Sequence, residues 1–132
     1  MTILWPTLTV RDVEATLAFY SERLGFKQDL AEKDDDGTTF LGSVEVGETV
    51  IMFESAGPDV HLQPDHGLTS GVMLTVCLPT TDELEVLYRR LQASDVNVCG
   101  PIGERPWGNR DFMIQDPDGY RLVIAAPISP NL

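Results

Sequence analysis

The feature that most constrains the fold of this chain is an internal repeat. The segment Leu8-Thr9-Val10 stands before one predicted helix, and Leu74-Thr75-Val76 stands before a second. After each helix come three segments in which apolar and polar residues alternate as they do in half-buried strands. The order of one strand, one helix and three strands therefore occurs twice. The sequence predicts an α+β fold, in which two βαβββ modules form a cupped mixed β-sheet with a ligand cleft between them.

The repeat also sets the domain organisation of the chain, which we expect to be a single domain of 132 residues. Residues 1–55 form the first predicted module, and residues 71–127 form the second. Residues 56–70 are rich in Gly, Pro, Asp and His, and are predicted to be a linker. The predicted strands cover residues 3–10, 26–31, 38–46, 49–54, 71–78, 96–99, 110–115 and 120–125.

Both predicted helices carry apolar residues at helical spacing. The first covers residues 13–24, after the N-cap candidate Asp12 and before Gly25, which is expected to end the helix. The second has apolar residues at positions 84, 87, 88 and 91 and follows the cap candidates Thr80, Thr81 and Asp82. A hairpin turn is predicted at residues 116–119, where the sequence reads Asp-Pro-Asp-Gly.

The charge of the chain excludes one class of partner. Its 21 acidic and 9 basic residues give a formal net charge of −12. Binding to DNA or RNA needs a basic surface, so we expect no nucleic-acid partner. The excess of negative charge favours either solubility alone or the attraction of a cationic ligand, and both interpretations stay open.

The sequence gives no reason to expect a membrane protein. No apolar run approaches the roughly 20 residues that a membrane-spanning helix needs. The first residues lack the basic and apolar regions of a secretory signal, so we expect a cytoplasmic protein. Cys77 and Cys99 lie in apolar, strand-like surroundings and are expected to be buried thiols.

Four segments stand out in order along the chain: Leu8-Thr9-Val10-Arg11-Asp12-Val13, Ala18-Phe19-Tyr20 with Leu24-Gly25-Phe26, Pro106-Trp107-Gly108-Asn109-Arg110-Asp111-Phe112, and Asp116-Pro117-Asp118-Gly119-Tyr120. Together they resemble the vicinal oxygen chelate superfamily, which includes glyoxalase I, extradiol dioxygenases and bleomycin-resistance proteins. The resemblance covers nearly the whole chain, and it is nearest to the metal-free branch that includes bleomycin-resistance proteins. A homodimer is implied, because such relatives form their clefts with help from a partner chain.

The resemblance also implies where a metal would be held. Metal-dependent relatives use His and Glu ligands from four strands, and these positions fall here on Trp5, Met52, Met73 (or its neighbour Val72) and Val123. Divalent ions need imidazole nitrogen or carboxylate oxygen, which indole, thioether and aliphatic side chains do not supply. We therefore expect no metal site, no cofactor and no catalytic residue. A binding protein is favoured over an enzyme.

Strand alternation indicates which residues face the cleft. Leu8 and Val10 are expected to pack under the first helix, so that their neighbours in the strand point the other way. Trp107 and Arg110 either stack on a planar ligand and bind a carboxylate, or pack locally and pair with a surface acid. The predicted ligand-binding residues are Trp5, Thr7, Met52, Glu54, Met73, Thr75, Trp107, Arg110 and Val123.

The sequence thus favours a metal-independent protein that binds a small organic molecule, in the manner of proteins that sequester a cationic or aromatic antibiotic. A first alternative is a metal-dependent lyase, isomerase or dioxygenase whose ligands have moved to Glu54, His61 and His66. A second alternative is a ligand-sensing accessory domain. These three hypotheses concern the same fold, because one fold can support several chemistries.

Overall fold

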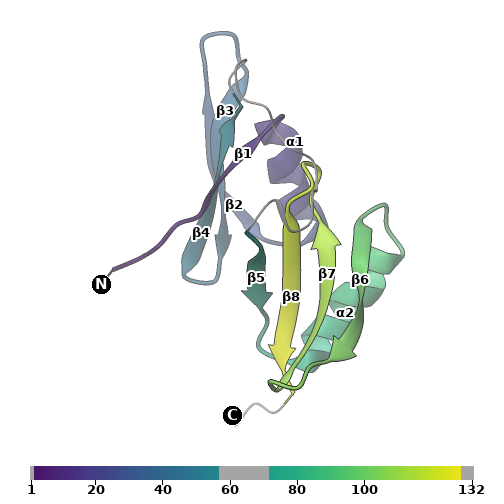
Figure 1. Cartoon of the computed structure of the whole chain (residues 1–132). Coiled ribbons are helices and arrows are strands. Elements are labelled where there is room, and N and C mark those ends of the chain that lie inside the picture. The colour runs from purple at the N-terminus through teal and green to yellow at the C-terminus, as the bar shows by residue number, and fades with distance from the viewer. Residues whose placement is uncertain (1, 57–71, 129–132) are drawn as a thin grey trace. The chain divides into compact units, whose positions relative to one another are not determined.

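The computed structural model describes residues 2–56 and 72–128. The chain divides into two compact units, residues 1–63 and 64–132. Each unit contains one mixed sheet of four strands and one helical segment, in the order βαβββ. The α+β fold with two βαβββ modules is therefore confirmed (Figure 1).

The first unit holds a sheet, named sheet 1, in the strand order β1-β4-β3-β2. Strand β1 runs parallel to β4, and the other neighbours are antiparallel. The first strand of the unit thus pairs with its last strand at one edge of the sheet. The elements are β1 (Thr7–Val10), α1 (Val13–Ala18), the π-helical turn η1 (Phe19–Arg23), β2 (Lys27–Lys33), β3 (Thr39–Val46) and β4 (Thr49–Ser55).

The helical segment of the first unit begins and ends where the sequence predicts. The side chain of Asp12 accepts a hydrogen bond of 3.0 Å from the backbone N–H of Ala15, as expected of an N-cap. Gly25 has a φ of 81°, a value that L side chains rarely adopt, and it ends the helix. The last turn is π-helical, and the hydroxyl of Ser21 donates to the carbonyl of Leu17 at 2.7 Å. Such bonds back to the preceding turn compete with regular helical geometry.

The helical segment covers one face of sheet 1, and the unit's core lies between the two. Tyr20 and Phe53 are fully buried, and their ring centroids lie 4.7 Å apart. Gly42 of β3 lets the helix approach closely, since a Cβ at this position would come within 2.8 Å of the Leu17 side chain. The other buried apolar residues of the unit are Leu8, Val10, Val13, Leu17, Leu24, Val44 and Ile51.

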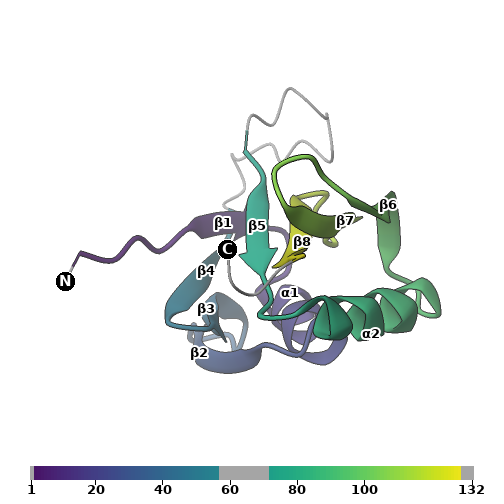
Figure 2. The ribbon, with the colours of Figure 1, turned by 90° about the horizontal axis from the view of Figure 1, so that it is seen from below.

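The second unit repeats this plan in a sheet, named sheet 2, with the strand order β5-β8-β7-β6. Its strand β5 is parallel to β8, and the remaining pairs are antiparallel. Figure 2 shows the helix of this unit along one side of its sheet. The elements are β5 (Leu74–Cys77), α2 (Thr81–Gln92), β6 (Asn97–Glu104), β7 (Asn109–Gln115) and β8 (Arg121–Pro127).

Two polar side chains fix the ends of elements in the second unit. Thr80 is the N-cap of α2 among the three candidates, because its hydroxyl oxygen accepts from the backbone N–H of Glu83 at 3.2 Å. In the predicted turn, one carboxylate oxygen of Asp116 accepts from the backbone N–H groups of Asp118 and Tyr120, at 2.9 and 3.0 Å. Gly119 completes the turn with a φ of 89°.

No helix in the described parts of the chain is long and apolar enough to cross a membrane.

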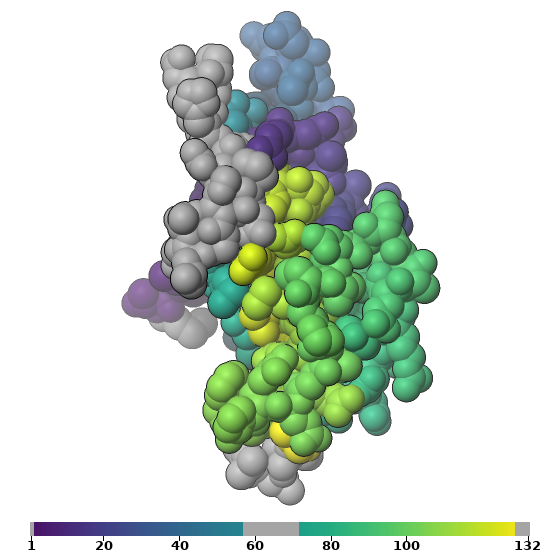
Figure 3. All heavy atoms as spheres, turned by 45° about the vertical axis from the view of Figure 1, so that its right-hand side comes forward, coloured from purple at the N-terminus to yellow at the C-terminus, as the bar shows by residue number. Residues whose placement is uncertain are grey.

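The structure differs from the sequence prediction at the edges of both sheets. Strands β1 and β5 are shorter than predicted, and β6 continues five residues beyond its predicted end at residue 99, to Glu104. Cys77 and Cys99 are exposed, so the expectation of buried thiols is wrong. Both lie on edge strands, where an apolar environment in sequence does not imply cover in space, and Figure 3 shows β6 (green) at the surface.

We predict that Phe53→Ala lowers the free energy of unfolding by about 3–5 kcal/mol, because it leaves a cavity beside Tyr20. Phe40→Ala on the neighbouring strand is the control, because Phe40 is 44% exposed. Its effect is expected to stay below about 1 kcal/mol. Urea unfolding followed by far-ultraviolet circular dichroism measures both, and equal losses for the two variants would contradict the described core.

Candidate functional site

Each sheet has one face that carries no helix of its own unit, and we call it the helix-free face. On β1, Leu8 and Val10 are buried toward α1, whereas Thr7 is exposed on the other side. On β5, Val76 is buried and its neighbour Thr75 is exposed in the same way. The predicted ligand-binding residues can therefore be assigned to faces from the strand registers.

The helix-free face of sheet 1 carries a carboxylate at its centre. Thr9, Glu54 and Leu41 lie side by side on β1, β4 and β3. The hydroxyl of Thr9 donates to Oε1 of Glu54 at 3.1 Å. The Glu54 side chain remains exposed, so it is oriented by Thr9 and still open to a ligand.

A second row on the same face is formed by Thr7, Met52 and Ser43. Ser43 is buried, and its hydroxyl oxygen accepts from the backbone N–H of Leu30 at 3.1 Å, where β2 bulges. Met52 is half-buried between the exposed Thr7 and the buried Ser43. This row offers a thioether and a hydroxyl beside the Glu54 carboxylate.

The helix-free face of sheet 2 has an apolar centre. Thr75, Val123 and Met113 are neighbours on β5, β8 and β7. Gly100 of β6 continues the row, and a Cβ there would lie 3.0 Å from the Cβ of Met113. Val123 and Met113 are half-buried, so this face combines apolar surface with one hydroxyl.

Three other predicted residues lie at the margins of the units. Trp5 and Met73 precede the edge strands β1 and β5 and are 56% and 52% exposed. Trp107 lies in the turn between β6 and β7 and is 71% exposed. The turn is closed by a backbone hydrogen bond of 3.1 Å from Gly108 to Arg105. These side chains are accessible, but the described contacts do not bring them onto the centres of the helix-free faces.

Arg110 lies on the opposite face of sheet 2 from Thr75 and Val123. It shares the face of Phe112 and packs toward α2, where its guanidinium Nη2 lies 2.6 Å from Oε1 of Glu85. Nη1 is also 3.8 Å from Oε1 of Glu104. Of the two interpretations of Arg110, the pairing with acids is the one that the structure contains. Its place in a ligand-binding set is therefore not supported by its position.

Asp111 and Arg105 were missed by the sequence prediction. Asp111 is only 9% exposed on the helix-free face of sheet 2, and its Oδ1 accepts from Nε of Arg105 at 2.8 Å. Arg105 is about one-third exposed, and its Nη2 donates to the carbonyl of Pro101 at 3.5 Å. The face on which Asp111 lies could have been predicted from the sequence. Phe112 and Ile114 must face α2, and strand alternation then places Asp111 on the other side.

The strand registers allow the two repeats to be compared position by position. When the repeats are aligned through Leu8-Thr9-Val10 and Leu74-Thr75-Val76, Thr9 corresponds to Thr75. The partner of Thr9 is Glu54 and the partner of Thr75 is Val123. The counterpart of Val123 in the first unit is therefore Glu54, two residues beyond the predicted Met52. The same alignment places the counterpart of Trp5 at Gly71, outside the described residues, and not at Met73.

The residues at these positions do not fit a divalent metal ion. Glu54 is the one carboxylate among them, whereas Trp5 and Val123 offer no ligand atom and glycine has no side chain. Over residues 2–56 and 72–128, no three His, Cys, Asp or Glu side chains are grouped closely enough to hold a metal. His61 and His66, which an alternative hypothesis invokes, lie outside the described residues. The chemistry available on these faces is ionic, hydrogen-bonding and apolar contact.

Comparison with known proteins identifies the family. The family model described as Glyoxalase/Bleomycin resistance protein/Dioxygenase superfamily matches residues 2–124. TnmS3, an antibiotic binding protein from Streptomyces sp. CB03234, is 25% identical, with 96% of each chain covered and a TM-score of 0.68.

Two further solved structures share the fold. TioX from Micromonospora sp. ML1 is 18% identical, with 97% of this chain and 98% of that chain covered and a TM-score of 0.71. A glyoxalase/bleomycin resistance protein/dioxygenase from Nocardioides is 24% identical, with 98% and 85% covered and a TM-score of 0.71. No curated protein matches the chain in sequence. Because the family model spans nearly the whole chain, this protein belongs to the glyoxalase/bleomycin resistance protein/dioxygenase superfamily.

Proposed function

We propose that this protein binds a small organic cation with aromatic or apolar character, without a metal ion, on the helix-free faces of its sheets. The observation that carries the proposal is the pair of equivalent positions Glu54 and Val123. One offers a carboxylate oriented by Thr9, and the other offers an aliphatic surface beside Met113. The first position suits ionic contact with an organic cation, and the second suits apolar contact.

The charge of the whole chain supports a cationic ligand. With a formal net charge of −12, the protein raises the local concentration of cations around it. Glu54 then supplies a specific partner for one positive group, while the thioether of Met52 on the same face adapts to irregular apolar shapes. Long-range attraction and short-range contact thus favour the same class of ligand.

The comparison with TnmS3 supports an antibiotic as the ligand. That protein is described as antibiotic binding, and it is similar to this chain along nearly the full length of both. Binding of this kind protects by holding a toxic molecule, and it needs no chemical step. The homodimer that the resemblance implies remains part of the proposal, and sedimentation equilibrium of the purified chain would measure it.

We predict that the purified protein retains less than about a tenth of an equivalent of any divalent metal, because one carboxylate alone is a weak ligand set. The measurement is elemental mass spectrometry after incubation with Ni²⁺, Mn²⁺, Zn²⁺ or Fe²⁺ and desalting. Retention of one equivalent of a single metal would overturn metal independence. In that case, loss of the bound metal in the Glu54→Gln variant would identify Glu54 as a ligand.

We predict that Glu54→Gln weakens the binding of a cationic bleomycin-type glycopeptide by roughly fivefold, which is the loss expected for one exposed ion pair. Gln keeps an oxygen that accepts from Thr9, so the substitution removes the charge and preserves the hydrogen bond. Glu48→Gln, in the turn between β3 and β4, is the matched control and should bind as the unchanged chain does. Tryptophan fluorescence titration gives both constants, and an equal loss in the two variants would point to general electrostatics alone.

We predict that Arg110→Gln leaves binding of the same glycopeptide unchanged and lowers the free energy of unfolding by about 1 kcal/mol, because Arg110 pairs with Glu85 on the helix side. Urea unfolding and the fluorescence titration measure the two effects separately. A loss of ligand affinity without a loss of stability would return Arg110 to the binding site.

A further inference from the structure

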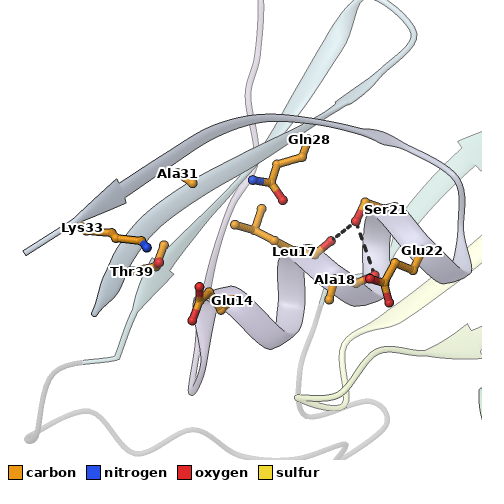
Figure 4. Close-up of a pocket in the computed structure, with 9 residues that line it drawn as sticks. All are labelled: Glu14, Leu17, Ala18, Ser21, Glu22, Gln28, Ala31, Lys33 and Thr39. Atoms are coloured by element: carbon orange, nitrogen blue, oxygen red, sulfur yellow. Dashed lines mark hydrogen bonds between the residues drawn. The ribbon is translucent and has the colours of Figure 1, made fainter. Parts of the chain in front are cut away.

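A pocket of about 400 Å³ opens between the helical segment of the first unit and the adjoining strands β2 and β3. It lies on the helix side of sheet 1, away from the face that carries Glu54. Figure 4 shows the side chains around it, with Leu17 on the helix pointing toward the strands that carry Ala31 and Thr39. The lining residues are Glu14, Leu17, Ala18, Ser21, Glu22, Gln28, Ala31, Lys33 and Thr39.

One hydroxyl group in this pocket, that of Thr39, has no hydrogen-bond partner in the described parts of the chain. Thr39 is 4% exposed, and its hydroxyl oxygen is buried. Buried hydroxyl groups are nearly always hydrogen-bonded, and an unmatched one points to a missing partner. Because Thr39 lines the pocket, a molecule entering it can supply that partner after a small rotation of the side chain.

The charged residues are distributed over the two ends of the pocket. Lys33 is the register partner of Thr39, and Figure 4 shows the ammonium of Lys33 and the hydroxyl of Thr39 at the same end. Glu22 lies at the other end, beside Ser21. Glu14 and Glu22 are eight residues apart in the helical segment, which corresponds to about 12 Å along a helix. The positive end is thus separated from the carboxylate of Glu22 by the apolar floor of Leu17, Ala18 and Ala31.

We propose that this pocket binds a small zwitterion, with an ammonium and a carboxylate group separated by a short aliphatic chain. The carboxylate of such a molecule meets Lys33 and accepts a hydrogen bond from Thr39. The ammonium group meets Glu22, and the chain lies on the apolar floor. Glu14 is exposed beside Lys33 and weakens the attraction of any carboxylate to this end, so binding also requires the contact of the ammonium group with Glu22.

The site is separate from the one proposed for the cationic ligand. Lys33, Thr39 and Ala31 share the face of sheet 1 that the helical segment covers, whereas Thr7, Met52 and Glu54 lie on the other face. Either site can be tested without the other, and failure of one proposal leaves the other standing.

The test uses 6-aminohexanoate as the probe, titrated into the ¹⁵N-labelled full chain and followed by amide chemical shifts. We expect shifts around the pocket and a Kd on the order of 1 mM, as suits a small ligand held by a few contacts. Hexanoate and hexylamine, which carry one charge each, should bind at least about fivefold more weakly. No shift at the pocket, or equal binding of either single-charge probe, overturns the proposal.

Variants separate local contacts from general charge effects. Lys33→Gln should weaken 6-aminohexanoate at least about fivefold, and Lys27→Gln at the opposite end of β2 is the matched control with no expected change. Thr39→Val should weaken the probe similarly, because it removes the hydroxyl and keeps the shape. Ala31→Phe fills the pocket and should abolish binding. Equal effects of the two lysine variants, or full binding to Ala31→Phe, would contradict the assignment.

Discussion

The packing of one helical segment on one face of each sheet is the constraint on which the rest of this structure depends. A strand shows its side chains alternately to two faces, so burying one set under a helix leaves the other set without local cover. Tyr20 and Phe53 fill the covered side in the first unit, and Phe112 and Ile114 do so in the second. The remaining side chains are free to carry chemistry because the fold does not need them for its core.

The two units use the same framework for different surfaces. At one pair of equivalent positions, the first unit has Glu54 with a hydroxyl neighbour, and the second has Val123 beside Met113. The backbone pairing is the same in both, so the difference lies in side chains alone. This is how a superfamily with one fold supports metal enzymes and binding proteins, and why the family name does not by itself settle an activity.

Much of the fold could be predicted from sequence because its signals are local. Asp12 and Asp116 cap and turn the backbone through contacts within four residues, and such contacts are visible in the order of residues. Register between strands is not local. The shift from Met52 to Glu54 could not be seen until β1 and β4 were paired, because the two segments are about 45 residues apart. The pairing of Arg110 with Glu85 is not local either, because all of β6 separates α2 from β7 in the sequence.

The pairing of each unit's first strand with its last has a consequence for how the chain reaches this structure. Thr7 can pair with Met52 only after the whole first unit has been made. In the same way, Thr75 can pair with Val123 only after the whole second unit has been made. Contacts of such long sequence separation slow folding, because the loop between them must be closed before they contribute. During synthesis, β1 and then β5 must each wait as an unpaired strand until the end of its own unit emerges. The last strand of each unit therefore completes its sheet. Strand β4 pairs with β1 first, and β8 pairs with β5 afterwards.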